Sequence, residues 1–134
     1  MKTATAIILA VISLANQQLD KPYNYASAGP NSFDCSGLVY YCFMEAAEIE
    51  LPRTAKEIGY DETYEKIESI DDLEIGDIVC FNTNSGDSDL SDHVGIYLGD
   101  HEFIHASSSQ GKVIISPLNE GYYNETFSWA RRIN

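Results

Sequence analysis

The apolar residues of this 134-residue chain change their spacing near Asp77. From Cys35 to Ala47 they recur at intervals of three and four residues, which indicates an amphipathic helix with one face in a core. Beyond Asp77 they form short runs separated by turns rich in Gly, Ser and Asp, which is typical of strands. Helices followed by strands predict an α+β fold rather than alternating βαβ units.

The second half is predicted to form an antiparallel sheet of about five strands. These strands are expected at residues 78–81, 93–98, 102–106, 112–116 and 127–133. The first half adds the helix at 35–47, a short helical turn ending at Ile58, and a solvated acidic connection at 61–72. Because the length suits one hydrophobic core, we predict a single domain over residues 1–134, with the N-terminal helices packed on the C-terminal sheet.

Residues 1–19 allow two interpretations. A basic residue at position 2, an apolar run at 6–14 and the small residues at 13–15 imitate a secretory signal peptide. No polar turn follows this run, so it can instead continue as one helix into the fold. The buried stripe of that helix would comprise Leu9, Ile12, Leu14 and Leu19. We predict a first core helix and keep the signal peptide as the alternative.

The chain carries 21 acidic and 8 basic residues, which gives a formal net charge of −13. Affinity for nucleic acids and anionic membranes is built mainly from clustered Lys and Arg, so we expect neither nucleic acid nor a membrane as a partner. The three cysteines lack CxxC spacing and encode neither a disulfide framework nor a four-thiolate zinc site. No cofactor is predicted, and nothing in the sequence defines an oligomeric state.

Cys35 stands where the 35–47 helix is expected to begin, and Asp34 is a candidate cap for its first turn. The dipole and unpaired amide hydrogens of a helix start stabilise a thiolate, so this placement predicts a lowered thiol pKa and a nucleophile. Cys42 lies two turns further along the apolar face, and Cys80 lies in a predicted strand. Both are interpreted as small core residues.

Two histidines lie on neighbouring predicted strands that are joined by a turn at 99–101. If this turn is a three-residue loop, Leu98 pairs with Glu102, and His93 lies diagonally across from His105 on one face of the sheet. A two-residue loop would place the two side chains on opposite faces. The geometry of the pair therefore depends on the register of this hairpin.

A helix packed on the shared face would bring Cys35 within reach of His93, with His105 orienting the imidazole as the third member of a triad. Such a set of side chains suits nucleophilic attack on an acyl group. The same three side chains could instead hold a zinc ion with water in the fourth position, although their spacing matches no compact metal motif. We predict the Cys-His-His triad and no metal site, with the zinc site as an alternative.

A series of short segments extends over nearly the whole chain. The two most specific are Asp34-Cys35-Ser36-Gly37 and His93-Val94-Gly95-Ile96-Tyr97. The others are Lys21-Pro22-Tyr23, Leu51-Pro52-Arg53-Thr54, Gly76-Asp77-Ile78-Val79, Ile104-His105-Ala106 and the residues 129–133. In this order they resemble the NlpC-type papain-like cysteine peptidases. The resemblance implies a papain-like fold and hydrolysis of peptide stems of bacterial peptidoglycan, commonly after γ-D-glutamate, without a metal.

The resemblance also implies a role for individual residues. Cys35 matches the nucleophile, His93 the general base and then acid, and His105 the orienting residue. Tyr23 matches a tyrosine that lies beside the nucleophile and can donate to the oxyanion. The backbone N–H of Cys35 would be the second donor.

Three further positions match residues of the family that surround the nucleophile. Asp34 and Ser36 resemble positions that contact the amino-terminal portion of the stem, although a helix cap and a first-turn hydroxyl explain them equally well. Arg53 matches a family arginine, for which a structural ion pair is an equal alternative. These three residues are predicted to bind substrate on the strength of the resemblance.

The residues and the resemblance together predict a cysteine endopeptidase that acts on peptidoglycan stem peptides or muropeptides. A wall substrate implies a secreted or cell-wall-associated protein. Two alternatives remain open: an acyltransferase or amidase on the same fold, and a catalytically inactive module that binds cell-wall fragments.

Overall fold

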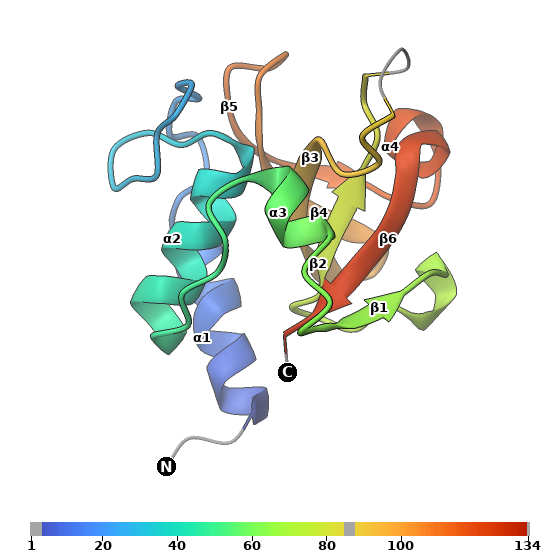
Figure 1. Ribbon diagram of the computed structural model, residues 1–134. Coiled ribbons are helices and arrows are strands. Elements are labelled where there is room, and N and C mark those ends of the chain that lie inside the picture. The colour runs from blue at the N-terminus through green and yellow to red at the C-terminus, as the bar shows by residue number, and fades with distance from the viewer. Residues whose placement is uncertain (1–3, 85–87, 134) are drawn as a thin grey trace.

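The computed structural model describes residues 4–84 and 88–133 (Figure 1). Helices α1 (Ala4–Asn16), α2 (Cys35–Ala47) and α3 (Ala55–Gly59) gather on one side of a sheet. A short helix, α4 (Gly121–Thr126), precedes the last strand, and a 3₁₀ turn, η1 (Ile70–Asp72), follows the first. Within these two ranges no helix is both long enough and apolar enough to cross a bilayer.

The described residues form one sheet of six antiparallel strands in the spatial order β1-β6-β2-β3-β4-β5. The strands are β1 (Glu65–Ile67), β2 (Ile78–Phe81), β3 (His93–Gly99), β4 (Glu102–Ser107), β5 (Lys112–Pro117) and β6 (Phe127–Arg132). Helices followed by an antiparallel sheet confirm the predicted α+β class. The predicted strands end within one residue of the observed ones.

Strand β1 and helix α4 were not predicted. Strand β1 has three residues at the edge of the sheet and pairs with β6. Of its side chains only Ile67 is buried, while Lys66 lies over the Trp129 ring at 4.2 Å from the ring centroid. Such a strand is held in place by its neighbour rather than by its own propensity, so the acidic stretch around it showed no strand period.

Helix α1 packs on α2 with a different stripe from the one predicted. Its fully buried residues are Val11 and Ala15. Two members of the predicted stripe are exposed, Leu9 at 55% and Leu19 at 37%, and the other two are partly buried. Leu9 lies two positions from Val11 and so faces away from it, and Leu19 lies in the turn beyond the end of α1. The helical period was correct, but the phase was wrong.

Helix α2 begins at the predicted residue because Asp34 caps it. The Asp34 carboxylate accepts a hydrogen bond from the Gly37 N–H at 2.6 Å. A Cβ at position 37 would collide with the Ser27 carbonyl oxygen, so glycine lets the preceding loop pass close to the helix start. Four fully buried side chains fix α2 over β3 and β4: Leu38, Val39, Cys42 and Phe43.

The two faces of the sheet carry separate apolar clusters. Ile96 and Ile104 belong to the cluster that α1 and α2 cover. Phe81 and Phe103 belong to the cluster on the other face, where Tyr123 of α4 packs against them. Since side chains alternate along each strand, every residue of β3 and β4 is assigned to one face or the other.

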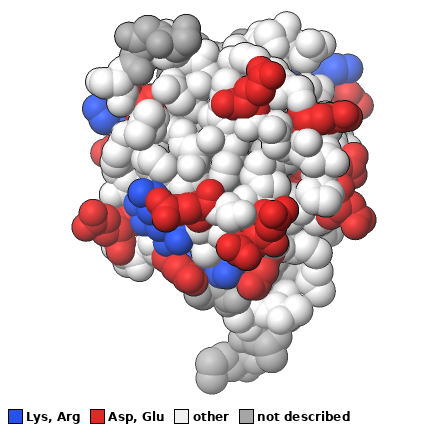
Figure 2. Space-filling model, turned by 90° about the vertical axis from the view of Figure 1, so that its right-hand side faces the viewer, with Lys and Arg blue, Asp and Glu red and all other residues white. Residues whose placement is uncertain are grey.

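The surface reflects the acidic composition. Figure 2 shows the face on the right of Figure 1, where acidic side chains outnumber basic ones and surround a broad uncharged area. Several cations are already paired with carboxylates: Arg53 with Asp34, Lys66 with Glu68, Lys112 with Asp20, and Arg132 with Glu74 and Asp77. Each of these ion pairs joins a cation to an anion, so the net charge of the chain stays negative and few of these cations remain free to bind an anion.

Candidate active site

The β3–β4 hairpin places the two histidines diagonally across from each other, as predicted, but by a different route. Ile96 pairs with Ile104, and Gly99 pairs with Glu102, so the turn has two residues instead of three. A bulge between Tyr97 and Gly99 takes up the extra residue and restores the register further along the hairpin. A two-residue turn therefore does not separate the histidines, contrary to the expectation.

The turn residues Asp100 and His101 both have positive φ, 52° and 61°. This conformation is the one that tight two-residue hairpin turns require. His101 is exposed at the tip, and its backbone N–H donates to the Tyr97 hydroxyl at 3.1 Å. Its side chain lies apart from the other two histidines, as expected for a solvated turn residue.

The histidines project from the face of the sheet opposite α2, and in this respect the prediction was wrong. His105 stacks on Phe103 with the ring centroids 4.4 Å apart, and Tyr123 packs edge-on against His105 at 4.9 Å. His93 contacts Tyr123 and Phe81 in the same cluster. The first turn of α2 therefore does not lie above the histidines, and it approaches the sheet at the start of β3, where Val94 contacts Cys35.

A chain of hydrogen bonds crosses three strands from His93. Its Nε2 lies 2.8 Å from His105 Nδ1, and His105 Nε2 lies 2.8 Å from the Ser116 hydroxyl oxygen on β5. In one of its two directions His93 Nε2 donates to His105, which then donates to Ser116. That direction leaves the other nitrogen of His93, Nδ1, without a proton and able to act as a base.

Burial keeps both imidazoles neutral. It lowers the pKa of His93 to about 4, with the nearby Asp92 carboxylate opposing the shift. Burial, and to a smaller extent the neighbouring His93, lowers the pKa of His105 to about 2. At neutral pH the pair therefore enters any reaction without a charge.

Cys35 is partly buried at the first position of α2, and its thiol pKa is raised, not lowered as its position predicted. Burial is the largest cause, and the carboxylates of Asp34 and Asp92 add to it. The backbone N–H groups of Val94 and Ser36 act in the opposite direction. The thiol is thus protonated at rest and needs a base when it reacts.

The other cysteines behave as core residues. Cys42 and Cys80 are fully buried, and burial raises the pKa of each thiol to about 12. Cys35 differs from both because it is accessible and has backbone N–H groups around it. The backbone of Val94, the residue after His93, contacts Cys35, so the start of α2 meets the start of β3. The structure forms no hydrogen bond between Cys35 and His93, both of which it describes.

An ion pair holds the start of α2. Arg53 bonds both oxygens of Asp34, with Nη1 3.1 Å from Oδ1 and Nη2 2.9 Å from Oδ2. Nη1 also donates to the Ser36 hydroxyl at 2.9 Å. The structure thus shows the helix cap at Asp34 and its ion pair with Arg53, while the substrate contacts of Asp34, Ser36 and Arg53 stay a prediction. Their remaining donors and acceptors line the space in front of Cys35.

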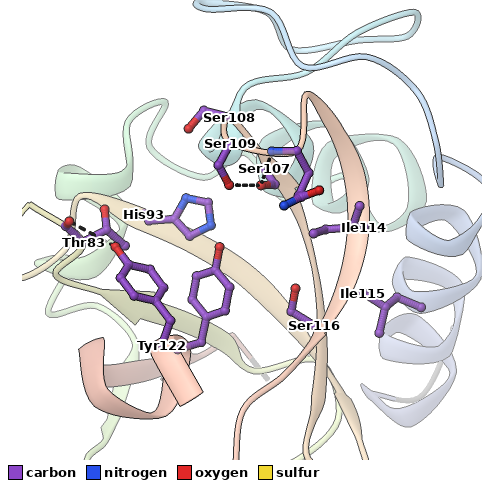
Figure 3. Close-up of a pocket in the computed structure, with 11 residues that line it drawn as sticks. Thr83, His93, Ser107, Ser108, Ser109, Ile114, Ile115, Ser116 and Tyr122 are labelled. Atoms are coloured by element: carbon purple, nitrogen blue, oxygen red, sulfur yellow. Dashed lines mark hydrogen bonds between the residues drawn. The ribbon is translucent and has the colours of Figure 1, made fainter. Parts of the chain in front are cut away.

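Two hollows flank the thiol and the imidazole. A hollow of about 410 Å³ is lined by all of the predicted residues on the helix side: Tyr23, Asp34, Cys35, Ser36 and Arg53. Burial raises the pKa of the Tyr23 phenol, and the nearby Cys35 and Asp34 raise it further, so it stays a hydrogen-bond donor. A second hollow, of about 740 Å³, is lined by His93 (Figure 3).

The second hollow contains residues that the sequence did not single out. Ser116, Tyr122 and Tyr123 line it together with the turn between β4 and β5. Figure 3 shows His93 lying between Tyr122 and the serines of that turn. A polar residue at position 116 in an otherwise apolar strand was the available signal, but only the pairing of β4 with β5 shows that it meets His105.

No group of three or more His, Cys, Asp or Glu side chains is arranged to hold a metal ion within residues 4–84 and 88–133. The two facing ring nitrogens, His93 Nε2 and His105 Nδ1, are hydrogen-bonded to each other. They therefore do not converge with Cys35 on a common point, as the alternative zinc site would require.

Comparison with known proteins gives a consistent result. "Probable endopeptidase YafL" of Escherichia coli is 41% identical over 118 residues, which is 87% of this chain and 46% of that protein. "Murein DD-endopeptidase MepS/Murein LD-carboxypeptidase" of the same organism is 39% identical over 111 residues, 83% of this chain and 55% of that protein. The chain thus spans about half the length of these relatives.

Among solved structures, NlpC1 from Trichomonas vaginalis superimposes with a TM-score of 0.85 at 31% sequence identity. The match covers 98% of this chain and 45% of that one. Residues 20–132 match the model of the NlpC/P60 family, and they include the thiol, both histidines and both hollows. The chain belongs to the NlpC/P60 family.

Proposed function

We propose that this protein is a cysteine peptidase that hydrolyses an amide bond in peptidoglycan stem peptides, after γ-D-glutamate. The observation that carries the proposal is the meeting of the partly buried Cys35 thiol with the start of β3, where His93 is held by His105. Relatives that carry the names of endopeptidases, two of them murein endopeptidases, support the class of reaction and of substrate.

The first step is attack by sulfur. The Cys35 proton passes to the neutral His93, and the thiolate adds to the carbonyl carbon of the stem amide. The negative charge that develops on the carbonyl oxygen is met by the Tyr23 phenol and by the N–H of Cys35, which has no intrahelical acceptor in the first turn of α2. Because the Cys35 thiol and the His93 imidazole both start neutral, the thiolate–imidazolium pair forms only as the sulfur attacks.

The second step releases the amine. The protonated His93 gives its proton to the departing nitrogen, the carbon–nitrogen bond breaks, and the acyl group stays on sulfur as a thioester. Water then attacks this thioester, with His93 again accepting a proton, and the thiol is restored as the carboxylic acid leaves. His105 fixes the plane of the His93 ring through both steps.

The hollow on the helix side would bind the acyl portion of the stem. Asp34, Ser36 and Arg53 present charged and hydroxyl groups to the end of the substrate that remains attached to Cys35. The substrate class places the enzyme where peptidoglycan or its fragments occur, so we infer that it acts as a secreted or cell-wall-associated protein on stem peptides or muropeptides.

The test is digestion of purified peptidoglycan, with mass spectrometry of the released fragments. Cys35→Ala should abolish release. Cys42→Ala provides the matched control, because it removes a sulfur from the buried face of the same helix and should leave activity near that of the wild type. Equal release by the wild type and Cys35→Ala would disprove the proposal. Transfer of the acyl group to an added amine, without free acid, would identify an acyltransferase instead.

A further inference from the structure

The two hollows beside the reacting groups differ in charge. The one next to Cys35 is lined by Asp34, Arg53 and Asp92, all of them charged. None of the described residues that line the other one is Lys, Arg, Asp or Glu. Its polar groups are the hydroxyls of serine, threonine and tyrosine, one glutamine amide and His93. We call this second space the neutral hollow.

The order of bond breaking assigns one part of the substrate to each hollow. The acyl part stays on Cys35, which lines the charged hollow. The departing amine takes its proton from His93, which lines the neutral hollow. A donor must lie within hydrogen-bond distance of the atom that it protonates, so the residue that begins with the departing nitrogen extends from His93 into the neutral hollow.

The neutral hollow has a polar end and an apolar side. Ser108 and Ser109 lie at one end in Figure 3, while Ile114 lies along one side and Tyr122 lies across from it. Methylene groups are suited to the isoleucine and tyrosine surfaces. Serine hydroxyls can rotate to donate or accept, so they can satisfy both halves of a carboxamide.

A carboxylate would be received less well at the same place. It would lose part of its hydration, and none of the described residues that line the hollow is Lys or Arg, while His93 is neutral in the resting enzyme. The net charge of −13 adds a repulsive field, and several of the cations in the described structure are already paired with carboxylates elsewhere. The lining therefore distinguishes an uncharged amide from a carboxylate.

We propose that the neutral hollow binds the diamino acid that begins the departing half of the stem, and that it selects a side chain ending in a carboxamide over one ending in a free carboxylate. This inference rests on the proposed function, because it takes the departing half from the hydrolysis of a stem amide. It adds a specificity that depends on residues beyond the thiol and the histidines.

The first test compares two soluble stem peptides, L-Ala-γ-D-Glu-diaminopimelate with the terminal carboxyl of the diaminopimelate side chain either free or amidated. We expect kcat/KM to be at least tenfold higher for the amidated peptide, and the ratio to shrink as salt is added. Equal values, or a preference for the free carboxylate, would overturn the selectivity while the cleavage itself upheld the proposed function. If neither peptide were cleaved, both proposals would fail.

The second test places a cation in the hollow. Gln110 is exposed in the β4–β5 turn and lines the hollow, so Gln110→Lys should raise the carboxylate-to-amide ratio of kcat/KM at least fivefold. Gln17→Lys makes the same chemical change on an exposed residue that lines neither hollow, and should leave the ratio within twofold. An unchanged ratio in Gln110→Lys would show that the side chain does not bind in this hollow.

Discussion

The helix side and the sheet side of the site are organised by opposite means. On the helix side, a carboxylate, a guanidinium and a cap hydrogen bond hold the first turn of α2, and the groups involved are charged. On the sheet side, two imidazoles and a hydroxyl are joined across three strands among aromatic rings, and none is charged at neutral pH. The thiol lies where the two sides meet.

This difference separates the groups that position the helix and the substrate from the groups that transfer protons. Charged groups near the surface hold a helix start and bind polar substrate ends, but their strength depends on salt. The neutral side chains that are hydrogen-bonded from His93 to Ser116 keep their geometry at any salt concentration, and burial sets the pKa values of the two histidines. The protonated thiol at the start of α2 and the neutral imidazole at the start of β3 therefore carry no charge in the resting enzyme.

The largest effect should follow from removal of the base. His93→Ala should lower kcat/KM by about 10³-fold, because the variant lacks the imidazole that accepts the thiol proton and returns it to the amine. His105→Gln should cost about 10²-fold, since water can partly replace an orienting group. The measurement is the rate of stem-peptide cleavage, with His101→Gln as a control at the exposed turn. Equal losses at His93 and His105 would contradict this division of roles.

The buried pair should also make stability depend on pH. The folded-state pKa values of His93 and His105 lie below that of an unfolded histidine, so the unfolded chain binds more protons as the pH falls below 6.5. Stability is therefore lost on acidification, by about 2 kcal/mol for each histidine at pH 5. Urea unfolding of wild type and His105→Gln at pH 8 and pH 5 measures this loss.

The variant should lose less stability than the wild type between these two pH values, because it has one buried imidazole fewer. The comparison at the same two pH values isolates the contribution of His105. His101→Gln should behave like the wild type. A loss in His105→Gln as large as that of the wild type would mean that His105 accepts a proton in the folded state.

The helix side was the more predictable from the sequence. The cap at Asp34, the start of α2 at Cys35 and the core position of Cys42 follow from residues that lie close together along the chain. The pKa of Cys35 could not be predicted in the same way. Its largest cause is burial by elements distant in the sequence, which outweighs the favourable helix start.

The sheet side depended on pairing that the sequence does not show. The diagonal arrangement of the histidines was predicted through a three-residue turn, whereas a two-residue turn and a bulge at Leu98 produce it. The face from which His93 projects and its contact with Tyr123 follow from packing against α4, an element without a clear sequence signal. A shift of one residue in the pairing of the hairpin would have turned the His93 side chain to the other face of the sheet and removed its contact with Tyr123.

On the helix side, Arg53→Gln should raise KM about tenfold, because it removes charge-assisted hydrogen bonds to Asp34 and Ser36 and leaves the carboxylate unpaired. The increase should become smaller at high salt, where the charges are screened. Lys66→Gln removes a cation from β1, away from both hollows, and should leave KM unchanged. An effect of Arg53→Gln on kcat alone would indicate that the ion pair acts on the thiol rather than on substrate.

The smallest effect tests Ser116, at the far end of the hydrogen bonds that run from His93 through His105. Ser116→Ala should lower kcat by about threefold to tenfold, the value of one net hydrogen bond, because His105 would lose the acceptor that holds its tautomer. Ser116→Thr keeps the hydroxyl and should restore most of the rate. Ser128→Ala, on β6 outside both hollows, is the matched control.

The pH profile separates this positioning role from a contact with substrate. If Ser116 acts through His105, its loss should lower kcat and alter the acid limb, which for the wild type lies below the usual histidine pKa because burial lowers that of His93 to about 4. KM should change by less than twofold. A rise in KM with kcat and the profile unchanged would instead place Ser116 among the groups that bind the departing half of the substrate, since it also lines the neutral hollow.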